Sequence, residues 1–343
     1  MKLYESKLND QDVSEISELL KSGDFGFGKY AEYFESEFES FSTNMCNIST
    51  NSASGAAFMI FAYLKEKYGV CDVYTPSIGF TSPAWSAHHH GHNLIWVDVD
   101  ENLLFDVSDY EEERRLRCVR YSDGGVTPVV MPILYGGVSK IPGLESLRNT
   151  GYGEVIVVDS AHCVTPKNPY ADFTFFSFHP YKPIAASDGG MISTDYEEAR
   201  IYFEKYRNFG RAVTPRGYDI DSEGFKFYMN NLNACIALTQ LKKYEENLKN
   251  RKETFKLVEE KFGSMGHLLP HDKDSSYYFA TLICDGDATK TLSNKYPVAK
   301  HYPMLHMMKY YSFTQPKVLY NTETLHSRIV NLPLYDISIY NDV

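Results

Sequence analysis

The sequence predicts an α/β protein with a mixed, mostly parallel sheet, followed by a smaller α/β unit. Apolar runs with the length of buried strands recur along the first part of the chain. Segments with apolar residues at helical spacing alternate with these runs, as is typical of strands joined by helices. A long helical stretch then separates the two parts. We therefore expect a large domain over residues 1–230, and a linking helix with a smaller domain over residues 231–343.

The N-terminal part is expected to be helical. Apolar residues recur at helical spacing over residues 11–22 and 29–42, and glycines mark the loop between them. The small polar residues over 51–55 then open a third helix, which should run to about residue 68.

Short strands should form the sheet. Apolar and β-branched runs predict strands over residues 71–74, 93–99, 126–134, 154–159, 173–178 and 190–194. Residues 140–149, between the third and the fourth of these strands, have a helical pattern. Residues 231–262 form one long helical stretch, and the smaller unit begins at about residue 265.

Composition argues against several classes of function. The net charge of −11 opposes binding to nucleic acid. No apolar run reaches the roughly 18 residues that suggest a membrane span, and the N-terminus has no apolar signal segment. The six cysteines form no CxxC pair, which indicates reduced thiols. We expect a cytoplasmic protein with neither nucleic-acid nor membrane partners.

Lys182 and Asp159 carry the clearest chemical pattern. Asp159 ends the apolar run 155–158, so its carboxylate should project from the C-terminal end of a strand, where α/β proteins bind ligands. Lys182 follows the next predicted strand in apolar surroundings, which lower the pKa of an amine and make it nucleophilic. Proteins hold pyridoxal 5'-phosphate (PLP) with a lysine that forms a Schiff base and a carboxylate beside the pyridine nitrogen. His162 is placed to hydrogen-bond the 3-oxygen of this cofactor or to support Asp159. The alternatives are a surface lysine, an aspartate that caps a helix and a structural histidine.

A PLP site also needs a phosphate cradle and an aromatic cover. Ala53 and Ser54 stand at a predicted helix start, where free backbone N–H groups and a hydroxyl can bind phosphate. Ser177 can add a second hydroxyl. Phe80 follows a Pro-Ser turn and can stack on the pyridine ring, the alternative being a side chain of the core.

The histidines between residues 88 and 92 do not predict a metal site. His88 and His92 have the spacing of neighbours on a helix, but no carboxylate or cysteine joins them at the spacing of a metal ligand. We expect histidines on a solvated helix surface and no bound metal.

In their order along the chain, these motifs resemble the DegT/StrS family of sugar-nucleotide aminotransferases. Residues 177–182 with Asp188-Gly189-Gly190 are similar to the family's Ser-Phe-His-x-x-Lys…Glu-Gly-Gly, its most specific element. Residues 158–162 resemble its Glu-Asp-Ala-Ala-His/Gln, and residues 51–57 resemble its phosphate loop. The resemblance covers nearly the whole chain. It implies the fold of aspartate aminotransferase (fold type I of PLP enzymes), with three layers and a smaller C-terminal α/β domain.

The resemblance also assigns roles to residues. It implies that Lys182 carries PLP, that Asp159 is the partner of the pyridinium nitrogen, and that Ser54 and Ser177 bind the phosphate. Phe80 corresponds to the aromatic residue that stacks on PLP.

The chain departs from the family pattern near residue 226. The family's Tyr-Asn-Tyr-Arg-Met appears here as residues 225–229, where Lys226 replaces the Asn and Tyr228 replaces the Arg. The family's Asn reaches the PLP phosphate of the partner subunit. We therefore expect Lys226 to be a cofactor ligand across a dimer interface.

The resemblance implies a homodimer with shared active sites that moves the amino group of L-glutamate onto a nucleotide-linked keto-deoxy-sugar, at C3 or C4. Such a transaminase serves the biosynthesis of amino sugars and polysaccharides. A PLP-dependent sugar dehydratase of the same family is an alternative, but those enzymes replace the lysine with histidine, and Lys182 argues against it. A non-catalytic PLP-binding regulator of the same fold is the other alternative.

Overall fold

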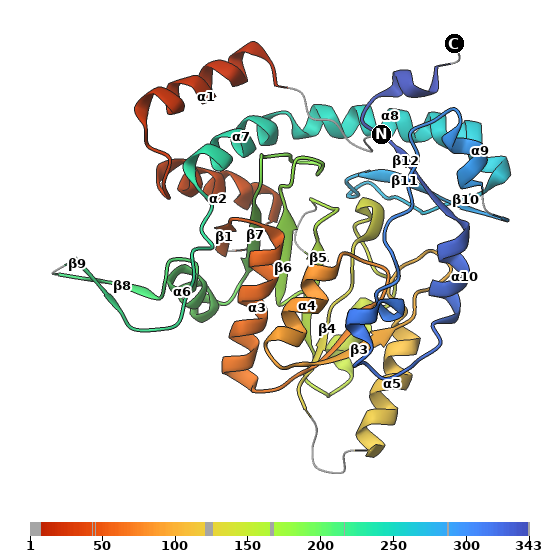
Figure 1. Ribbon diagram of the computed structural model, residues 1–343, viewed down its shortest axis with the longest axis horizontal. Helices are drawn as coiled ribbons and strands as arrows, with labels where there is room; N and C mark the ends of the chain where they lie inside the picture. Colours follow the sequence, from red (N-terminus) through yellow and green to blue (C-terminus); the bar gives the residue numbers. More distant parts are fainter. Residues whose placement is uncertain are drawn as a thin grey trace.

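The protein is built on a central sheet with helices around it, and a smaller sheet from the C-terminal part lies beside it (Figure 1). The computed structural model describes residues 8–42, 44, 46–120, 126–164, 168–215, 217–286 and 288–341.

The central sheet has seven strands in the order β1-β7-β6-β5-β4-β2-β3. The five strands from β6 to β3 run parallel to one another, and β7 is antiparallel to both of its neighbours. The prediction of a mixed, mostly parallel sheet is therefore confirmed. The strands are β1 Cys46–Thr50, β2 Asp72–Pro76, β3 Asn93–Val97, β4 Pro128–Val130, β5 Val155–Ser160, β6 Phe173–Ser177 and β7 Gly190–Thr194.

The strand β5 shows how the sheet separates two cores. Val155 and Val157 pack into a core with α3, whereas Ile156 and Val158 pack into a core on the opposite face. Successive side chains of a strand point to opposite faces, so Asp159 shares the face of Val155 and Val157. The end of β5 thus directs the Asp159 carboxylate toward the side of the sheet that α3 covers.

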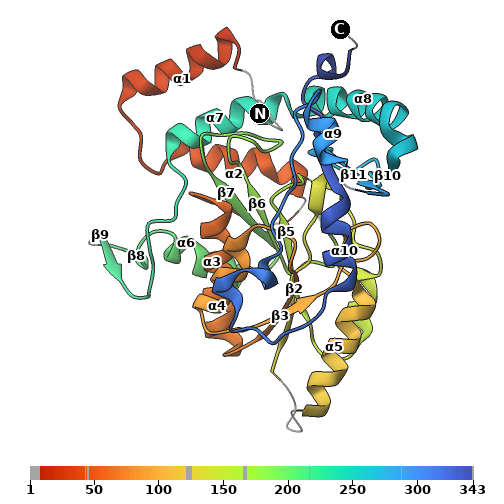
Figure 2. The same cartoon turned by 45° about the vertical axis from the view of Figure 1, so that its right-hand side comes forward.

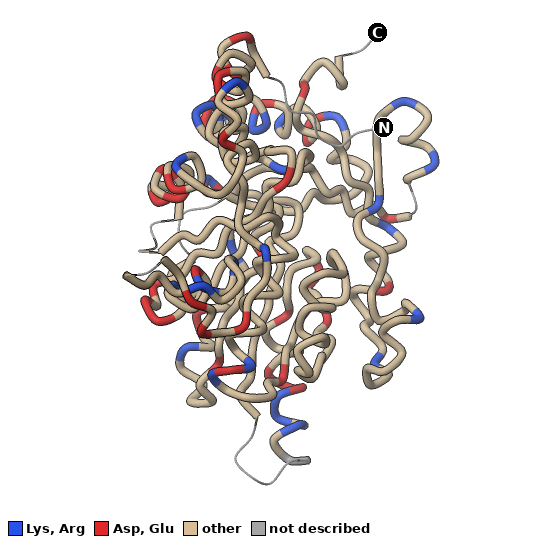
Figure 3. Tube along the Cα trace, turned by 60° about the vertical axis from the view of Figure 1, so that its left-hand side comes forward, with Lys and Arg blue, Asp and Glu red and all other residues tan. Residues whose placement is uncertain are grey.

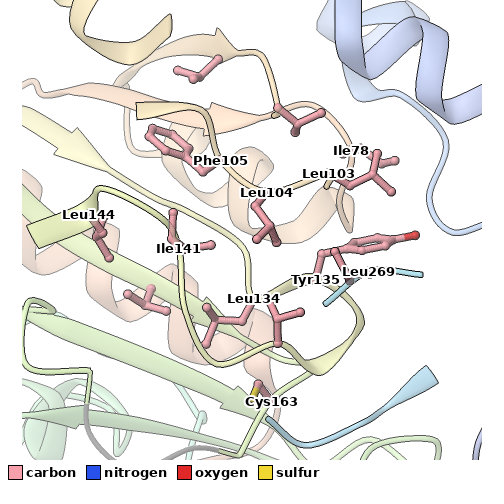
Figure 4. Packing of buried hydrophobic residues seen from close by; sticks show 14 of the residues in the cluster. Ile78, Leu103, Leu104, Phe105, Leu134, Tyr135, Ile141, Leu144, Cys163 and Leu269 are labelled. Atoms are coloured by element: carbon pink, nitrogen blue, oxygen red, sulfur yellow. The ribbon is translucent and has the colours of Figure 1, made fainter. Parts of the chain in front are cut away.

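Helices cover both faces of the sheet, which makes three layers (Figures 1 and 2). α3 and α6 pack on one face, and α5 packs on the other together with the apolar residues shown in Figure 4. α2 and α7 cover the β6 and β7 end of that second face. The helices of this part are α1 Asp10–Ser22, α2 Lys29–Ser42, α3 Ala53–Tyr68, α4 Thr81–His89, α5 Val107–Arg120, α6 Glu197–Tyr206 and α7 Asn231–Lys242.

The C-terminal part has an antiparallel sheet of its own, in the order β10-β11-β12. Its core includes Val258 and Phe262 of α8. The elements are α8 Tyr244–Phe262, β10 Gly266–Leu268, β11 Phe279–Cys284, α9 Thr289–Ser293, α10 Tyr320–Arg328 and β12 Ile329–Pro333. This sheet agrees with the predicted smaller α/β unit.

The predicted single helix over residues 231–262 is two helices, because the chain breaks at Lys243. α7 packs with α2 in the core of the large part, whereas Val258 and Phe262 of α8 pack on the small sheet. The chain passes from one core to the other within α8, after the break, because Tyr244 and Leu248 still pack in the core of α2 and α7. The domain boundary between residues 230 and 231 stays a prediction.

Two other predicted elements differ from the structure. Residues 140–149 form no α-helix, since Pro142 and Gly143, the latter with φ +74°, leave only a 3₁₀ helix over Leu144–Asn149. The strand predicted over 126–134 is shorter, because Pro132 has no N–H for the ladder beyond β4. The sequence did not predict β1, α5, α6 or the hairpin of β8 Arg211–Thr214 and β9 Gly217–Ile220. This hairpin projects from the body of the protein (Figures 1 and 2).

Charged residues lie mostly on the outer helices and loops, and the centre of the trace is largely uncharged (Figure 3). Across the described residues, no helix is both long enough and apolar enough to cross a membrane.

Candidate active site

A cavity of about 300 Å³ lies where β5 and β6 end and α3 begins. It brings together most of the residues that the sequence analysis selected, and it adds side chains from the C-terminal part. Its lining includes Ala53, Ser54, Phe80, Ser82, Asp159, His162, Ser177, His179, Lys182, Asp188, Tyr278, His301 and Tyr302. The carboxyl ends of parallel strands are where ligands bind in open α/β sheets.

Asp159 is fixed at the end of β5 by its own backbone. Its N–H donates to the Pro132 carbonyl at 2.9 Å, and its Oδ1 accepts from the Ala161 N–H at 2.9 Å. The side chain is buried, and burial raises the pKa of this carboxyl to about 6, against the opposing effects of the Ala161 N–H and Lys182. At neutral pH the group is therefore mostly an anion, at the base of an otherwise largely apolar cavity.

Lys182 approaches the same cavity from the loop after β6. Its N–H donates to the His179 carbonyl at 2.8 Å, and its Nζ lies 4.8 Å from the centre of the Tyr278 ring. Burial lowers the pKa of the Lys182 amine to about 8, although Asp159 acts in the opposite direction. A lysine with this pKa has a substantial neutral fraction near pH 8, and the neutral form is the nucleophile.

His162 lies in the cavity wall with both ring nitrogens engaged. Its Nδ1 accepts from the Gly136 N–H at 3.3 Å, and its Nε2 lies 2.9 Å from the Tyr302 hydroxyl. Burial, Lys182 and His301 together hold the pKa of His162 well below its usual range, so the ring is neutral. The hydrogen bond from His162 to the 3-oxygen of PLP stays a prediction.

The start of α3 forms one end of the cavity. Ser52 caps the helix, with its Oγ accepting from the Gly55 N–H at 3.0 Å, and Ser54 Oγ donates to Ser82 Oγ at 2.8 Å. The first N–H groups of a helix have no acceptor inside it and favour an anion. Gly190 of β7 crosses close behind, and a Cβ there would lie 2.5 Å from the carbonyl carbon of Ser52 and 2.6 Å from Ala53 N.

Phe80 and Ser177 complete the predicted lining. Phe80 is 56% exposed, and its ring meets the Tyr302 ring at 5.9 Å in an edge-on arrangement. Ser177 Oγ accepts from the His179 N–H at 3.4 Å. An amine, a buried carboxylate, a helix N-terminus with hydroxyls and an exposed aromatic ring thus surround one cavity. In this order, the four groups match the aldehyde, the pyridine nitrogen, the phosphate and the ring face of PLP.

Lys226 does not line this cavity. It is exposed, its Nζ lies 5.5 Å from the centre of the Tyr228 ring, and its carbonyl accepts from Asn51 Nδ2 at 3.3 Å. A role toward a partner subunit stays a prediction.

The histidines near residue 90 are not all on a solvated surface, which corrects the sequence analysis. α4 ends at His89, and His92 is buried, with Nδ1 accepting from the Cys71 N–H at 3.0 Å and Nε2 lying 3.0 Å from the Phe61 carbonyl. Within the ranges that the structure describes, no three His, Cys, Asp or Glu side chains are grouped to hold a metal ion.

Sequence reasoning missed Tyr278, His301 and Tyr302. All three come from the C-terminal part and line the cavity. No spacing in the sequence relates them to Lys182, because the packing of the small sheet against the large one brings them there. The run His301-Tyr302-Pro303, with two side chains able to donate hydrogen bonds, is the one local signal that could have drawn attention to them.

Comparison with known proteins assigns the chain to a family. Residues 6–340 match the DegT/DnrJ/EryC1/StrS aminotransferase family. The spore coat polysaccharide biosynthesis protein SpsC of Bacillus subtilis (strain 168) is 27% identical over 374 residues, which cover 98% of this chain and 92% of SpsC.

Solved structures show the same fold. PseC of Helicobacter pylori, an aminotransferase involved in the biosynthesis of pseudoaminic acid, superposes with a TM-score of 0.87 at 19% identity, over 98% of this chain and 95% of PseC. The putative sugar aminotransferase Spr1654 of Streptococcus pneumoniae, in its PMP form, has a TM-score of 0.86 at 22% identity, over 98% of this chain and 92% of Spr1654.

Proposed function

The chain belongs to the DegT/DnrJ/EryC1/StrS aminotransferase family, and on this premise we propose that it transfers the amino group of L-glutamate to a nucleotide-linked keto-sugar. PLP is the cofactor of this aminotransferase, and when bound it supplies an electron sink for the electron pair of the reacting carbon. The observation that carries the proposal is that Lys182, Asp159 and the start of α3 surround one cavity. A sugar acceptor is supported by SpsC, a protein of spore coat polysaccharide biosynthesis, and by Spr1654, a putative sugar aminotransferase.

Lys182 and Asp159 divide the chemistry between them. Lys182 would hold the cofactor through its amine, and the free amine, with a pKa of about 8, is well matched to move a proton to and from the reacting carbon at neutral pH. Asp159 would keep a proton on the pyridine nitrogen of the bound cofactor, because its carboxylate is buried in the cavity and is mostly anionic at neutral pH.

The phosphate of the cofactor is held by the start of α3. The backbone N–H groups at Ala53 and Ser54, the Ser54 hydroxyl and the Ser177 hydroxyl are the donors that we assign to it. Each hydrogen bond to a charged group contributes roughly 1.5–3 kcal/mol, so several such donors are needed to keep the cofactor in place between the two half-reactions.

We assign Lys226 to the phosphate in the other subunit of a homodimer. Its side chain lies outside the cavity of its own chain. A cation at that phosphate would offset part of its charge of roughly −1.5 to −2.

Two measurements test the proposal. Borohydride reduction of the PLP-loaded protein followed by peptide mapping should place the pyridoxyl group on Lys182. The protein should then form 2-oxoglutarate from L-glutamate with at least one member of a panel of UDP-, dTDP- and GDP-linked keto-sugars, and mass spectrometry should detect the amino sugar. Lys182→Ala is the control that should lose both signals. A label on another lysine, or a correctly labelled protein that aminates no keto-sugar nucleotide, would contradict the corresponding half of the proposal.

A further inference from the structure

Tyr302 occupies a place in the cavity that the proposed roles leave unexplained. It lies just before the 3₁₀ helix Leu305–Met307 and lines the cavity, where its ring contacts those of His162, Phe80 and His301. Among the described residues, His162 is the one hydrogen-bond partner of the Tyr302 hydroxyl. The hydroxyl can therefore make a further hydrogen bond. The direction of the bond to His162 decides whether the Tyr302 O–H is free to donate it.

The direction of that bond follows from the other side of the histidine ring. His162 is neutral and has one N–H, and its Nδ1 accepts from the Gly136 N–H at 3.3 Å. The proton is therefore on Nε2, which donates to the Tyr302 oxygen at 2.9 Å. Because Tyr302 accepts from His162, its own O–H remains available as a donor.

The position of Tyr302 is fixed by the small sheet. Ala299 exchanges two backbone hydrogen bonds with Asn331 of β12, at 3.1 and 2.8 Å. The Tyr135 hydroxyl accepts from Asn331 Nδ2 at 3.2 Å and donates to the carbonyl of His301. The segment that carries Tyr302 is thus tied to β12 on one side and to the large part on the other.

We propose that Tyr302 donates a hydrogen bond to an oxygen of the reacting complex, and that His162 is the residue that positions it. The proposal rests on the proposed function, since it requires PLP on Lys182. Two kinds of oxygen can accept this hydrogen bond. One is the 3-oxygen of the cofactor, and the other is a carbonyl or hydroxyl oxygen of the substrate. Burial, Tyr135 and Asp159 all raise the pKa of Tyr302, so the phenol keeps its proton as a donor at physiological pH.

Tyr302 thereby takes the part of hydrogen-bond donor that the sequence suggests for His162. The histidine ring nitrogens serve Gly136 and Tyr302, whereas the phenol faces the cavity. A hydroxyl on a rigid ring, held by a second ring, is a preorganised donor, and such donors act without reorganisation when charge develops.

The test compares Tyr302→Phe with the wild-type holoenzyme in two measurements. The first is the pH titration of the cofactor's absorption band without substrate. If the Tyr302 hydroxyl donates to the 3-oxygen of the cofactor, its loss removes a hydrogen bond that favours the anionic form of that oxygen. The midpoint of the titration should then rise by roughly one pH unit or more. The second is steady-state kinetics. If the hydroxyl donates to a substrate oxygen as charge develops, the midpoint should stay and kcat should fall about tenfold or more, with a much smaller change in KM.

Variants of His162 test its positioning role and protect the test against a Tyr302→Phe protein that fails to fold. His162→Leu removes the donor to Tyr302 and should reproduce the Tyr302→Phe signature. His162→Gln can still accept from Gly136 and donate to Tyr302, so it should restore most of the wild-type behaviour. Tyr320→Phe, at a position that is 78% exposed, is the matched control and should change neither measurement.

Wild-type values of both midpoint and kcat in Tyr302→Phe, or in His162→Leu where the first variant does not fold, would overturn the inference. Borohydride labelling of the wild-type protein is read first. Absence of a label on Lys182 would refute the proposed function itself, whereas a labelled protein with an unaffected Tyr302→Phe variant would refute only the role of Tyr302.

Discussion

Replacing Lys182 by Met should make the cofactor-free protein more stable at neutral pH. Lys182 is 9% exposed, and Met has a side chain of similar size without a charge. Burial lowers the pKa of this lysine from 10.5 to about 8. The folded state therefore disfavours the charged amine, and the buried charge destabilises the fold wherever the amine is protonated.

The magnitude follows from the two pKa values. A pKa difference of one corresponds to 1.36 kcal/mol, so the step from 10.5 to about 8 corresponds to about 3 kcal/mol. Below pH 8 lysine is charged in both states, and the whole cost is present. Between pH 8 and 10.5 the unfolded chain binds more protons than the folded one, so stability rises with pH; above 10.5 the cost is absent. The advantage of Lys182→Met should thus be about 3 kcal/mol at pH 7, about 2 kcal/mol at pH 9, and below about 0.5 kcal/mol at pH 10.5.

Urea unfolding of the two cofactor-free proteins at these three pH values measures the difference. Comparing the pair at each pH cancels the titration of the buried tyrosines and cysteines, which both proteins share. Lys249→Met, at an exposed position of α8, is the control for loss of a lysine charge and should show no such trend. A stability difference between wild type and Lys182→Met that stays constant from pH 7 to 10.5 would refute the reasoning, because packing changes do not depend on pH.

Three further predictions concern the proposed site. Asp159→Asn should lower kcat by about two decades or more, about 2.7 kcal/mol of transition-state stabilisation, and near-normal turnover would show that another group protonates the ring nitrogen. Gly190→Ala should destabilise the protein by about 1–3 kcal/mol and weaken PLP binding, because the added Cβ would overlap the backbone at the start of α3. Thermal unfolding and dialysis measure the two effects, and Gly263→Ala, with open space around it, is the control. Lys226→Ala should release PLP on dialysis. Mixing it with Lys182→Ala should restore part of the activity, since a mixed dimer has one intact site. If no activity returns, Lys226 does not act in the site of the partner subunit.

The sequence predicted the sheet and the central pair of the site because both depend on local pattern. Apolar runs identified β5 and β6, and the residues at the ends of those strands must meet at one edge of a parallel sheet. Asp159 and Lys182 could therefore be placed together without any long-range information. Ser54 was selected because a helix was predicted to start there, with free backbone N–H groups and a hydroxyl, although the strand β1 before it was not predicted.

Local pattern failed where packing between distant segments decides the structure. No Gly or Pro marks the break at Lys243, and residues of both α7 and α8 on its two sides pack in the core that contains α2. Tyr302 enters the cavity through hydrogen bonds of its segment to β12, at a separation that no motif spans. His92 is buried by the bonds of its ring to the backbone of Cys71 and Phe61, which its position in a histidine run could not indicate.

The opposite pKa changes of Asp159 and Lys182 have one cause and one consequence. The same burial raises the pKa of the carboxyl to about 6 and lowers the pKa of the amine to about 8, so between these pH values the cofactor-free protein holds two opposite charges in a largely apolar cavity that stabilises them poorly. In the proposed function, PLP held by the Lys182 amine would remove the cost of the buried ammonium, and its protonated ring nitrogen would give the Asp159 carboxylate a partner. The features that weaken the cofactor-free fold are therefore those that favour loading with PLP. This explains why an aminotransferase can keep a lysine buried beside a carboxylate, where in a purely structural core a pair of apolar side chains would serve better.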